Sequence, residues 1–174
     1  MFSTSSPEPQ AIIVMGVSGC GKSSVGARLA GRLGLPFIEG DVLHPAANVE
    51  KMARGIPLTD DDRWPWLDLI GAEIAASLSR AEGIVVSCSA LKRVYRQRLR
   101  AEAGGRLAFV YLEGTPELLE TRMGARTGHF MPPALLTSQL ATLEDPTGEP
   151  GVVTVSIDQP VEAIVEEALA ALWA

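Results

Sequence analysis

The stretch "AIIVMGVSGCGKSSVG", residues 11–26, joins an apolar run to a glycine-rich loop. The run at 11–15 is continuously apolar, which is typical of a strand buried on both faces of a parallel sheet. The pattern G-x-x-x-x-G-K-[ST] follows directly, in residues Gly16, Gly21, Lys22 and Ser23. From Lys22 the apolar residues recur at helical spacing until Gly34, a typical helix stop. A strand, this loop and a helix in that order predict a site for the phosphates of a nucleotide.

The loop is expected to bind phosphates through its main chain as well as its side chains. Its glycines let several N–H groups point at one anion, and the helix that follows adds the positive end of its dipole. We expect Lys22 to reach the β- and γ-phosphates of ATP and Ser23 to hold Mg²⁺. Cys20 is interpreted as a small residue that fits the turn, not as a catalytic thiol. The expected nucleotide-binding residues of the loop are Gly16, Val17, Ser18, Gly19, Cys20, Gly21, Lys22, Ser23 and Ser24.

Strand-like and helix-like segments alternate along the rest of the chain. Further apolar runs, separated by helical patterns, predict strands at 36–41, 83–90, 106–114 and 151–157. Such alternation indicates an α/β fold with a parallel sheet whose strand ends share one ligand-binding edge. Two long segments, 44–67 and 122–143, interrupt the rhythm and are predicted to be binding segments or lids. We expect one domain over 11–174, after a disordered tail at 1–10.

The composition argues against several classes of protein. The net charge of the 174-residue chain is -6, which disfavours a general nucleic-acid or membrane-surface binder and a nucleic-acid role for the basic helix at 92–100. Two cysteines are too few for a disulfide framework, and no apolar run reaches the roughly 18 residues that span a membrane. The N-terminus lacks the features of a secretory signal. We therefore expect a cytoplasmic protein that binds neither nucleic acid nor membrane.

The acidic residue Asp41 bears on what happens to the phosphate. The Asn-Lys-x-Asp motif of GTPases does not occur, and the strand at 83–90 ends in serines where ATPase motors carry an acid. Asp41 ends the expected strand at 36–41, on the same sheet edge as the phosphate loop. It could accept a proton from a substrate hydroxyl, orient that hydroxyl or help to hold Mg²⁺. The alternative is a turn or helix-capping aspartate, but the pattern favours phosphoryl transfer to a hydroxyl.

Four segments of the sequence, including the phosphate loop, together resemble a known family. The segments read "GVSGCGKS", "GDVLHPAANVEKMARGIPLTDDDRWPWL", "CSALKRVYRQRLR" and "RTGHFMPPALLTSQLATLE". Together they resemble gluconate kinase (gluconokinase), a small P-loop kinase similar to shikimate and nucleoside-monophosphate kinases, over about residues 11–172. The resemblance implies a three-layer P-loop kinase fold with a five-stranded parallel sheet, a substrate-binding insertion at 44–67 and a lid at 122–143. It also implies ATP and Mg²⁺ as cofactors, the 6-hydroxyl of D-gluconate as acceptor, and a homodimer.

Under this resemblance, polar residues around Asp41 would bind gluconate. A carboxylate favours arginine or lysine, and hydroxyls favour paired polar side chains. The candidate substrate-binding residues are Asp41, His44, Arg63, Lys92 and His129. Each has a structural alternative: Arg63 could pair with the preceding aspartates, Lys92 could be solvated, and His44 could be a turn residue.

The resemblance also assigns residues to the lid and to the adenine. Arg122 and Arg126 are spaced i, i+4 on one helix face, and lid arginines in similar kinases close over ATP and neutralise the transferring group. The alternative is a solvated basic face. Gln159 and Pro160, before the last helix, would lie against the adenine. The expected catalytic residues are Lys22, Asp41 and Arg126.

The insertion also contains tryptophans and aspartates that favour structural roles. Trp64 and Trp66 are expected to anchor the packing rather than to stack on a sugar. At least one residue of 60–62 is expected to cap a helix. Two other functions stay open: a kinase for another small polyhydroxy acid, and an ATP-binding switch without transfer. Asp41 and the two long segments disfavour the switch, because a switch needs no acceptor pocket.

Overall fold

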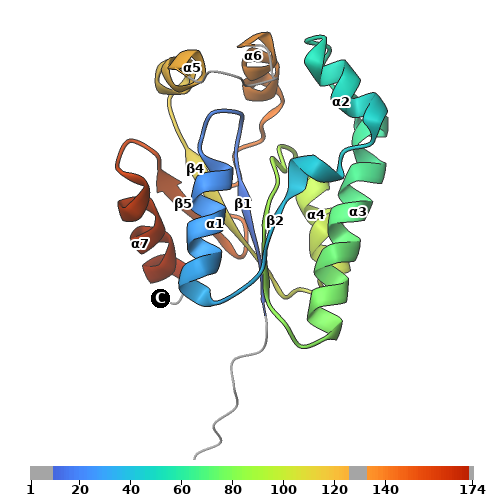
Figure 1. The fold of residues 1–174 in the computed structure, drawn as a ribbon, viewed down its shortest axis with the longest axis vertical. Coiled ribbons are helices and arrows are strands. Elements are labelled where there is room, and N and C mark those ends of the chain that lie inside the picture. Colours follow the sequence, from blue (N-terminus) through green and yellow to red (C-terminus); the bar gives the residue numbers. More distant parts are fainter. Residues whose placement is uncertain (1–9, 126–132, 173–174) are drawn as a thin grey trace, which may run out of the picture.

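A parallel sheet runs through the centre of the molecule, with helices on both faces (Figure 1). The structure is a computed structural model and describes residues 10–125 and 133–172. The five strands lie in the order β2-β3-β1-β4-β5, and every neighbouring pair is parallel. Their bounds are β1 Ala11–Met15, β2 Phe37–Glu39, β3 Ile84–Ser87, β4 Leu107–Glu113 and β5 Val152–Ser156. The predicted α/β fold with a five-stranded parallel sheet is therefore confirmed.

The central strands are apolar along their length because both of their faces are covered. Every residue of β1 and β3 is buried, and so is β4 apart from its last residue. β1 pairs with β3 on one side and β4 on the other, so Ile13 lies between Val86 and Phe109. Burial on two faces explains why these runs do not alternate between apolar and polar residues.

Helices form the two outer layers and also surround one edge of the sheet. Their bounds are α1 Lys22–Leu33, α2 Ala46–Ala53, α3 Asp60–Ser79, α4 Arg93–Glu102, α5 Pro116–Ala125, α6 Pro133–Thr142 and α7 Val161–Leu172. α1 packs against α7 on one face, and α3 packs against α4 on the other. α2, α5 and α6 lie beyond the carboxyl ends of the strands (Figure 1). The strand order reverses direction at β1, so the edge above β1 is where a ligand is expected in such a sheet.

The boundary after β2 differs from the prediction. β2 ends at Glu39, and Asp41 lies in the 3-10 helix η1, Gly40–Leu43, rather than at the strand end. A Cβ atom on Gly40 would lie only 2.0 Å from the carbonyl oxygen of Ser87, so the chain leaves the sheet at a point that excludes a side chain. Two acids therefore lie at the ligand edge: Glu39 at the end of β2 and Asp41 in the 3-10 helix that follows.

In their described residues, the two long segments are largely helical rather than irregular. Segment 44–67 contains α2 and the first turns of α3, and segment 122–143 contains the end of α5 and all of α6. Thr59 is the N-cap of α3: its hydroxyl accepts a hydrogen bond from the Asp62 N–H at 3.1 Å. The Asp62 carboxylate in turn accepts the Thr59 N–H at 2.9 Å, which completes a capping box. The expected capping role within 60–62 is confirmed for Asp62, although the cap residue itself is Thr59.

The buried residue Arg96 fixes the chain that follows β3. Its guanidinium donates to the carbonyl oxygens of Ala90 at 2.8 Å and Leu91 at 3.1 Å, and it pairs with the Glu149 carboxylate at 2.6 Å. Ala90 has a φ of 46°, a left-handed conformation that is unfavourable for a residue with a side chain. The hydrogen bonds from Arg96 therefore hold a strained turn at the ligand edge of the sheet.

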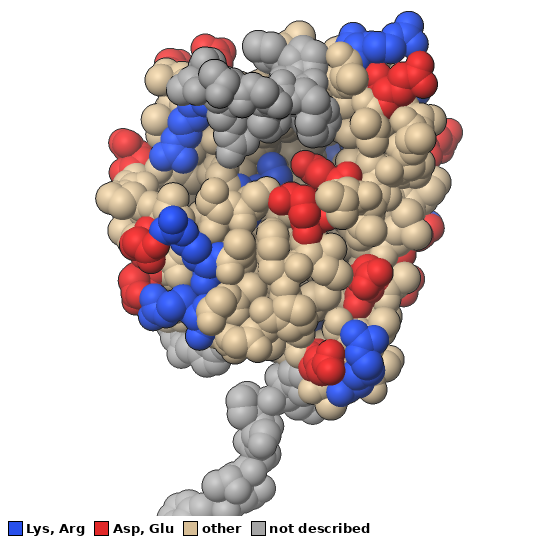
Figure 2. Space-filling view, in the orientation of Figure 1, with Lys and Arg blue, Asp and Glu red and all other residues tan. Residues whose placement is uncertain are grey.

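Charged side chains of both signs are interspersed on the face shown in Figure 2. Over α1 and α7, Arg28 pairs with Glu162 and Arg32 pairs with Glu166. This face consequently presents no broad basic surface. Within the described ranges, no helix combines the length and the apolar character that crossing a membrane requires.

Candidate active site

The phosphate loop turns sharply between β1 and α1 because glycine occupies its tightest point. Gly16 has a φ of 146°, and a Cβ atom there would lie 2.8 Å from Sγ of Cys20 and 3.0 Å from the carbonyl oxygen of Leu112. Gly21 has a φ of 92° and is the N-cap of α1. Cys20 is fully buried, in agreement with its interpretation as a residue that fits the turn. The loop conformation thus depends on Gly16, where there is no room for a side chain, and on Gly21, whose positive φ is unfavourable for other residues.

Lys22 and Ser23 begin α1 and face different partners. The Lys22 ammonium donates to the carbonyl oxygen of Val17 at 3.1 Å. The Ser23 hydroxyl donates to the carboxylate of Glu39, at the end of β2. The other oxygen of that carboxylate accepts a hydrogen bond from the Ser87 hydroxyl at 2.6 Å. The neighbouring strand therefore supplies the acid that β3 lacks, and Ser87 of β3 holds it in place.

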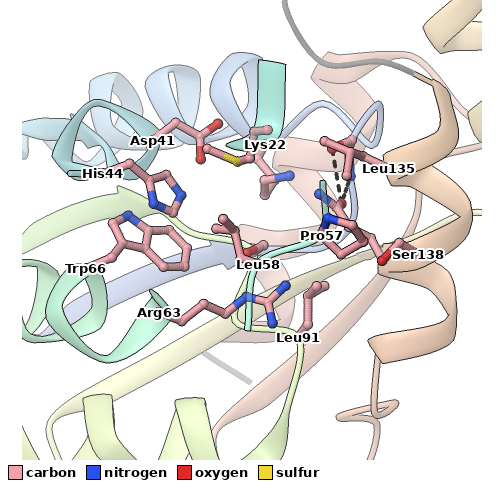
Figure 3. Close-up of a pocket in the computed structure, with 14 residues that line it drawn as sticks. Lys22, Asp41, His44, Pro57, Leu58, Arg63, Trp66, Leu91, Leu135 and Ser138 are labelled. Carbon is pink, nitrogen blue, oxygen red and sulfur yellow. Dashed lines mark hydrogen bonds between the residues drawn. The ribbon is translucent and has the colours of Figure 1, made fainter. Parts of the chain in front are cut away.

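A narrow cavity adjoins the loop, between the insertion at 44–67 and α6 (Figure 3). Its volume is about 40 Å³, which is room for only a few water molecules. Its polar lining residues are Ser18, Lys22, Asp41, His44, Arg63, Ser89, Ser138 and Gln139. Its apolar lining includes Met52, Pro57, Leu58, Trp66, Leu91 and Leu135. The cavity therefore combines a few polar groups with an apolar wall, as small-molecule sites commonly do.

Asp41 and Lys22 both lie at this cavity, with their side chains on the same side of it in Figure 3. Asp41 is half-buried in η1. Burial raises the pKa of the Cys88 thiol to about 12, so this cysteine stays protonated at neutral pH. The arrangement places a carboxylate, which can accept or orient a proton, at the same cavity as the ammonium of the phosphate loop.

His44 lies flat against Trp66, with ring centroids 4.0 Å apart and ring planes 15° apart. Trp66 is buried and donates its indole N–H to the carbonyl oxygen of Gly40 at 2.9 Å. Burial, helped by the positive charge of Arg63, lowers the pKa of His44 to about 4. His44 is consequently neutral at pH 7 and presents hydrogen-bonding nitrogens rather than a charge. The expected packing role of Trp66 is confirmed.

A hydrogen-bonded group holds Arg63 at the cavity. The Arg63 guanidinium donates to the Tyr95 hydroxyl at 2.9 Å, and that hydroxyl donates to the Asp60 carboxylate. Lys92 pairs with the same carboxylate at 3.0 Å. Trp64 packs edge-on against Tyr95, with ring centroids 5.5 Å apart, as expected of a packing anchor. Among the described residues, Arg63 forms no ion pair with the aspartates at 60–62, so its charge is available to the cavity.

α6 forms the wall of the cavity opposite the insertion. The N–H and the hydroxyl of Ser18 both donate to Oε1 of Gln139, at 2.7 and 3.0 Å. Leu135, one turn earlier in α6, packs against Met52 of α2, and Leu58 contacts the same small cluster. α6 therefore contacts the phosphate loop and the insertion at once.

The residues expected at the adenine gather at the end of β5. Arg122 of α5 donates to the carbonyl oxygen of Ile157 at 2.7 Å. The Gln159 side chain donates to the Ser156 carbonyl oxygen at 2.9 Å, and Pro160 directly precedes α7. Arg122 thus lies beside the loop that contains Gln159 and Pro160.

The structure brings together most of the residues singled out in the sequence, but not all of them. Ser18, Lys22, Asp41, His44 and Arg63 line one cavity. Lys92 is bound to Asp60 and does not line it. Arg126 and His129 lie outside the described residues.

Sequence reasoning did not identify Glu39, Tyr95 or Gln139. Glu39 left a signal, since an acid at the end of a buried strand resembles the acid expected near Mg²⁺. The sequence gives no such indication for Tyr95 and Gln139, because the neighbours of these two side chains are determined by how α4 and α6 pack. Their partners, Arg63 and Ser18, are far away in the chain.

Comparison with known proteins decides the family. A family model described as an AAA domain matches residues 12–146. A gluconokinase of Gluconobacter oxydans is 48% identical over 160 residues, which cover 92% of this chain and 89% of the relative. The chain belongs to the gluconokinase family.

Other members of the gluconokinase family match with similar coverage. The thermoresistant gluconokinase of Escherichia coli is 43% identical over 166 residues, or 94% of each protein. The crystal structure of a gluconokinase from Sinorhizobium meliloti has a TM-score of 0.88 and 59% identity, and covers 95% of this chain and 93% of that one. The resemblance seen in the four sequence segments and the predicted P-loop kinase fold are both confirmed.

Proposed function

We propose that the protein transfers the γ-phosphoryl group of ATP to the 6-hydroxyl of D-gluconate, forming 6-phospho-D-gluconate and ADP. The observation that carries the proposal is the position of Asp41 and Arg63 in one cavity that directly adjoins Lys22 and Ser18 of the phosphate loop. A hydroxyl acceptor with an anionic end fits that arrangement. Relatives that are named gluconokinases, at 43% and 48% identity, support the choice of gluconate.

In this proposal, residues 16–24 bind the phosphates of ATP. The main-chain N–H groups that follow Ser18 and the dipole of α1 attract the anion, and Lys22 moves from its hydrogen bond with Val17 to the β- and γ-phosphates. The adenine lies against the loop that contains Gln159 and Pro160, beside Arg122. Arg122 supports this position because it already contacts that loop through the Ile157 carbonyl oxygen.

Ser23 and Glu39 would hold Mg²⁺. A hydroxyl and a carboxylate that meet at the mouth of the loop are the hard oxygen ligands that this ion prefers. Within the described residues, no three His, Cys, Asp or Glu side chains gather at a metal site, so phosphate and water oxygens would complete the coordination. When bound, the ion neutralises charge that develops on the phosphate oxygens during transfer.

Asp41 would act on the acceptor. It accepts a hydrogen bond from the 6-hydroxyl and directs the hydroxyl oxygen at the γ-phosphorus. The new bond forms between these two atoms as the bond from phosphorus to the bridging oxygen breaks, and the electron pair leaves with ADP. The hydroxyl proton passes to Asp41 or to solvent. Because the transition state of phosphoryl transfer is loose, alignment contributes as much as removal of the proton.

Arg63 would bind the carboxylate of gluconate. A guanidinium matches a carboxylate with two parallel hydrogen bonds, and Tyr95 holds this guanidinium in place. His44 is neutral, which suits a hydroxyl partner rather than the carboxylate. Lys92 contributes indirectly, since its ammonium is engaged by Asp60. His129 stays a candidate for substrate binding, and Arg126 for neutralising the transferring group.

The proposal also assigns roles to the two long segments of the chain. Segment 44–67 is the substrate-binding insertion and segment 122–143 is the lid. A cavity of about 40 Å³ is small for a six-carbon acid, so the two segments must separate when gluconate enters. We further propose a cytoplasmic homodimer, in which Cys20 and Cys88 stay free thiols.

A kinase assay with a panel of acceptors tests the proposal. With ATP and Mg²⁺, gluconate should give the highest kcat/KM among sugar acids and polyols. A higher kcat/KM for another sugar acid would support the second candidate, a kinase for a related polyhydroxy acid. Absence of ATP consumption with every acceptor would contradict both.

A further inference from the structure

One oxygen atom of Gln139, in α6, accepts two hydrogen bonds from the phosphate loop. Oε1 of Gln139 accepts the N–H of Ser18 at 2.7 Å and the hydroxyl of Ser18 at 3.0 Å. A backbone N–H can only donate, which identifies the contacting atom of the carboxamide as its oxygen. Ser18 is 6% exposed, so this contact lies in a setting where a lost hydrogen bond is not readily replaced by bulk water.

The contact lies at the boundary between the phosphate loop and the acceptor cavity. Ser18 belongs to the loop, Gln139 belongs to α6, and both line the cavity together with Lys22 and Asp41. Figure 3 shows the two hydrogen bonds at the side of the cavity near Ser138 and Leu135. If α6 moved away from the phosphate loop at this position, water could enter between the two and reach the bound phosphates.

The other end of the same wall is closed by apolar side chains. Leu135 and Met52 are 3% and 6% exposed and pack together, with Leu58 against them. α6 is therefore attached to the insertion by an apolar contact and to the phosphate loop by a polar one. Gln139 makes the contact at the phosphate loop.

We propose that Gln139 is a positioning residue that directs phosphoryl transfer to the sugar hydroxyl instead of water. By holding Ser18 it keeps α6 sealed against the phosphate loop, so that water does not reach the γ-phosphorus. If water attacks, the products are ADP and inorganic phosphate; if the 6-hydroxyl attacks, they are ADP and the phosphorylated acid. This inference rests on the proposed kinase function and deepens it by naming the residue that sets the ratio of the two outcomes.

The test compares Gln139→Met, which keeps the length of the side chain but loses the acceptor, with Gln139→Asn, whose oxygen is too short to reach Ser18. ATP hydrolysis without an acceptor should rise by about tenfold in both variants, because water exclusion is lost. With gluconate present, more than one ADP should form per phosphorylated product. Gln139→Glu keeps an acceptor oxygen and should stay near one to one. Thr137→Ala, on the exposed side of α6, should behave like the wild type.

The outcomes separate this inference from the proposed function. The hydrolysis measurement needs no acceptor, so it tests whether Gln139 excludes water even if gluconate is not the substrate. Failure of the wild type to phosphorylate gluconate would count only against the proposed function. A merely structural role would lower hydrolysis and transfer together and leave their ratio unchanged. Wild-type hydrolysis and a one-to-one ratio in both Gln139→Met and Gln139→Asn, at whatever rate, would overturn the proposal. If one variant does not fold, the other gives the same readout.

Discussion

The hydroxyl of Ser23 donates a hydrogen bond to the carboxylate of Glu39, and Ser87 holds the other oxygen of that carboxylate. The contact joins the first turn of α1 to the end of β2, across the mouth of the phosphate loop. It gives the loop a fixed negative charge from an edge strand, where P-loop proteins commonly use the strand next to β1. We therefore expect the magnesium dependence of the activity to depend on Glu39.

Replacement of Glu39 by glutamine should weaken the response to Mg²⁺. We expect the Mg²⁺ concentration for half-maximal activity to rise by about tenfold or more, because the ion loses an oxygen ligand and the loss of even an outer partner of a metal site has an effect of that size. The KM for gluconate should stay close to the wild-type value. A magnesium titration of initial rates measures both, with Glu50→Gln on the exposed face of α2 as the control. An unchanged titration curve would remove Glu39 from the magnesium site.

Replacement of Asp41 by asparagine should separate nucleotide binding from transfer. We expect kcat to fall by about two to four powers of ten, the usual effect of losing a positioned acid–base group. ATP should still bind with nearly normal affinity, because Asp41 lines the acceptor cavity and is not part of the phosphate loop. Calorimetric titration measures the affinity for ATP, and steady-state kinetics measure kcat. Turnover near that of the wild type would exclude Asp41 from the mechanism.

Replacement of Arg63 by glutamine should raise the KM for gluconate by about tenfold or more, because a charge-assisted contact with the carboxylate is lost. Tyr95→Phe should give a smaller rise, since it removes only the hydroxyl that orients the guanidinium. The KM for ATP should change little in either variant.

The control for this pair is Arg54→Gln, an exposed arginine at the end of α2. Acceptors that lack a carboxylate provide a second readout, because their KM should be insensitive to Arg63. If Arg63→Gln affects acidic and neutral acceptors equally, the carboxylate lies elsewhere.

His44 should make the stability of the protein depend on pH between about 6.5 and 4. Its folded-state pKa is lowered from 6.5 to about 4, mainly by burial, so in this range the unfolded chain binds a proton that the folded chain does not. The free energy of unfolding should therefore fall as the pH decreases, by on the order of 2 kcal/mol once partial exposure is taken into account.

Chemical denaturation at several pH values checks this effect. His44→Gln should flatten the dependence between pH 6.5 and 4 relative to the wild type. The carboxyl groups of Asp60, Asp62 and Glu149 have lowered pKa values, because of hydrogen bonds from Tyr95, Lys51 and Arg96 respectively, and begin to lose their contribution only near the acidic end of this range, from their ordinary pKa values of 3.8 to 4.5 downward. The same slope in wild type and variant would show that His44 does not titrate as its burial predicts.

The parts of the fold that sequence predicts well are those governed by local patterns. β1, the phosphate loop and α1 follow from one continuous stretch, and the expected strands match β2 to β5 to within three residues at each end. Gly34, the predicted stop of α1, does lie in the left-handed conformation. These features depend on burial and backbone preference, which neighbouring residues largely determine.

The parts of the site that sequence does not predict depend on contacts between distant elements. Asp60 and Lys92 lie 32 positions apart and pair only because α3 packs beside α4. Ser18 and Gln139 are 121 positions apart and meet only when α6 lies over the loop. Glu39 and Asp41 are two residues apart, but only the early end of β2 shows which one faces Ser23 and which one faces the cavity.

Phosphoryl transfer to the 6-hydroxyl is tested by identifying and quantifying the products that the wild-type protein forms from ATP, Mg²⁺ and D-gluconate. Phosphorus and proton NMR of the reaction locate the phosphate on the sugar acid, and chromatography quantifies ADP. We expect phosphate on the oxygen at carbon 6, with one ADP formed per phosphorylated gluconate, and at least a hundredfold less product with Asp41→Asn. Inorganic phosphate and ADP without a phosphorylated acid, or phosphate on a different oxygen, would contradict it.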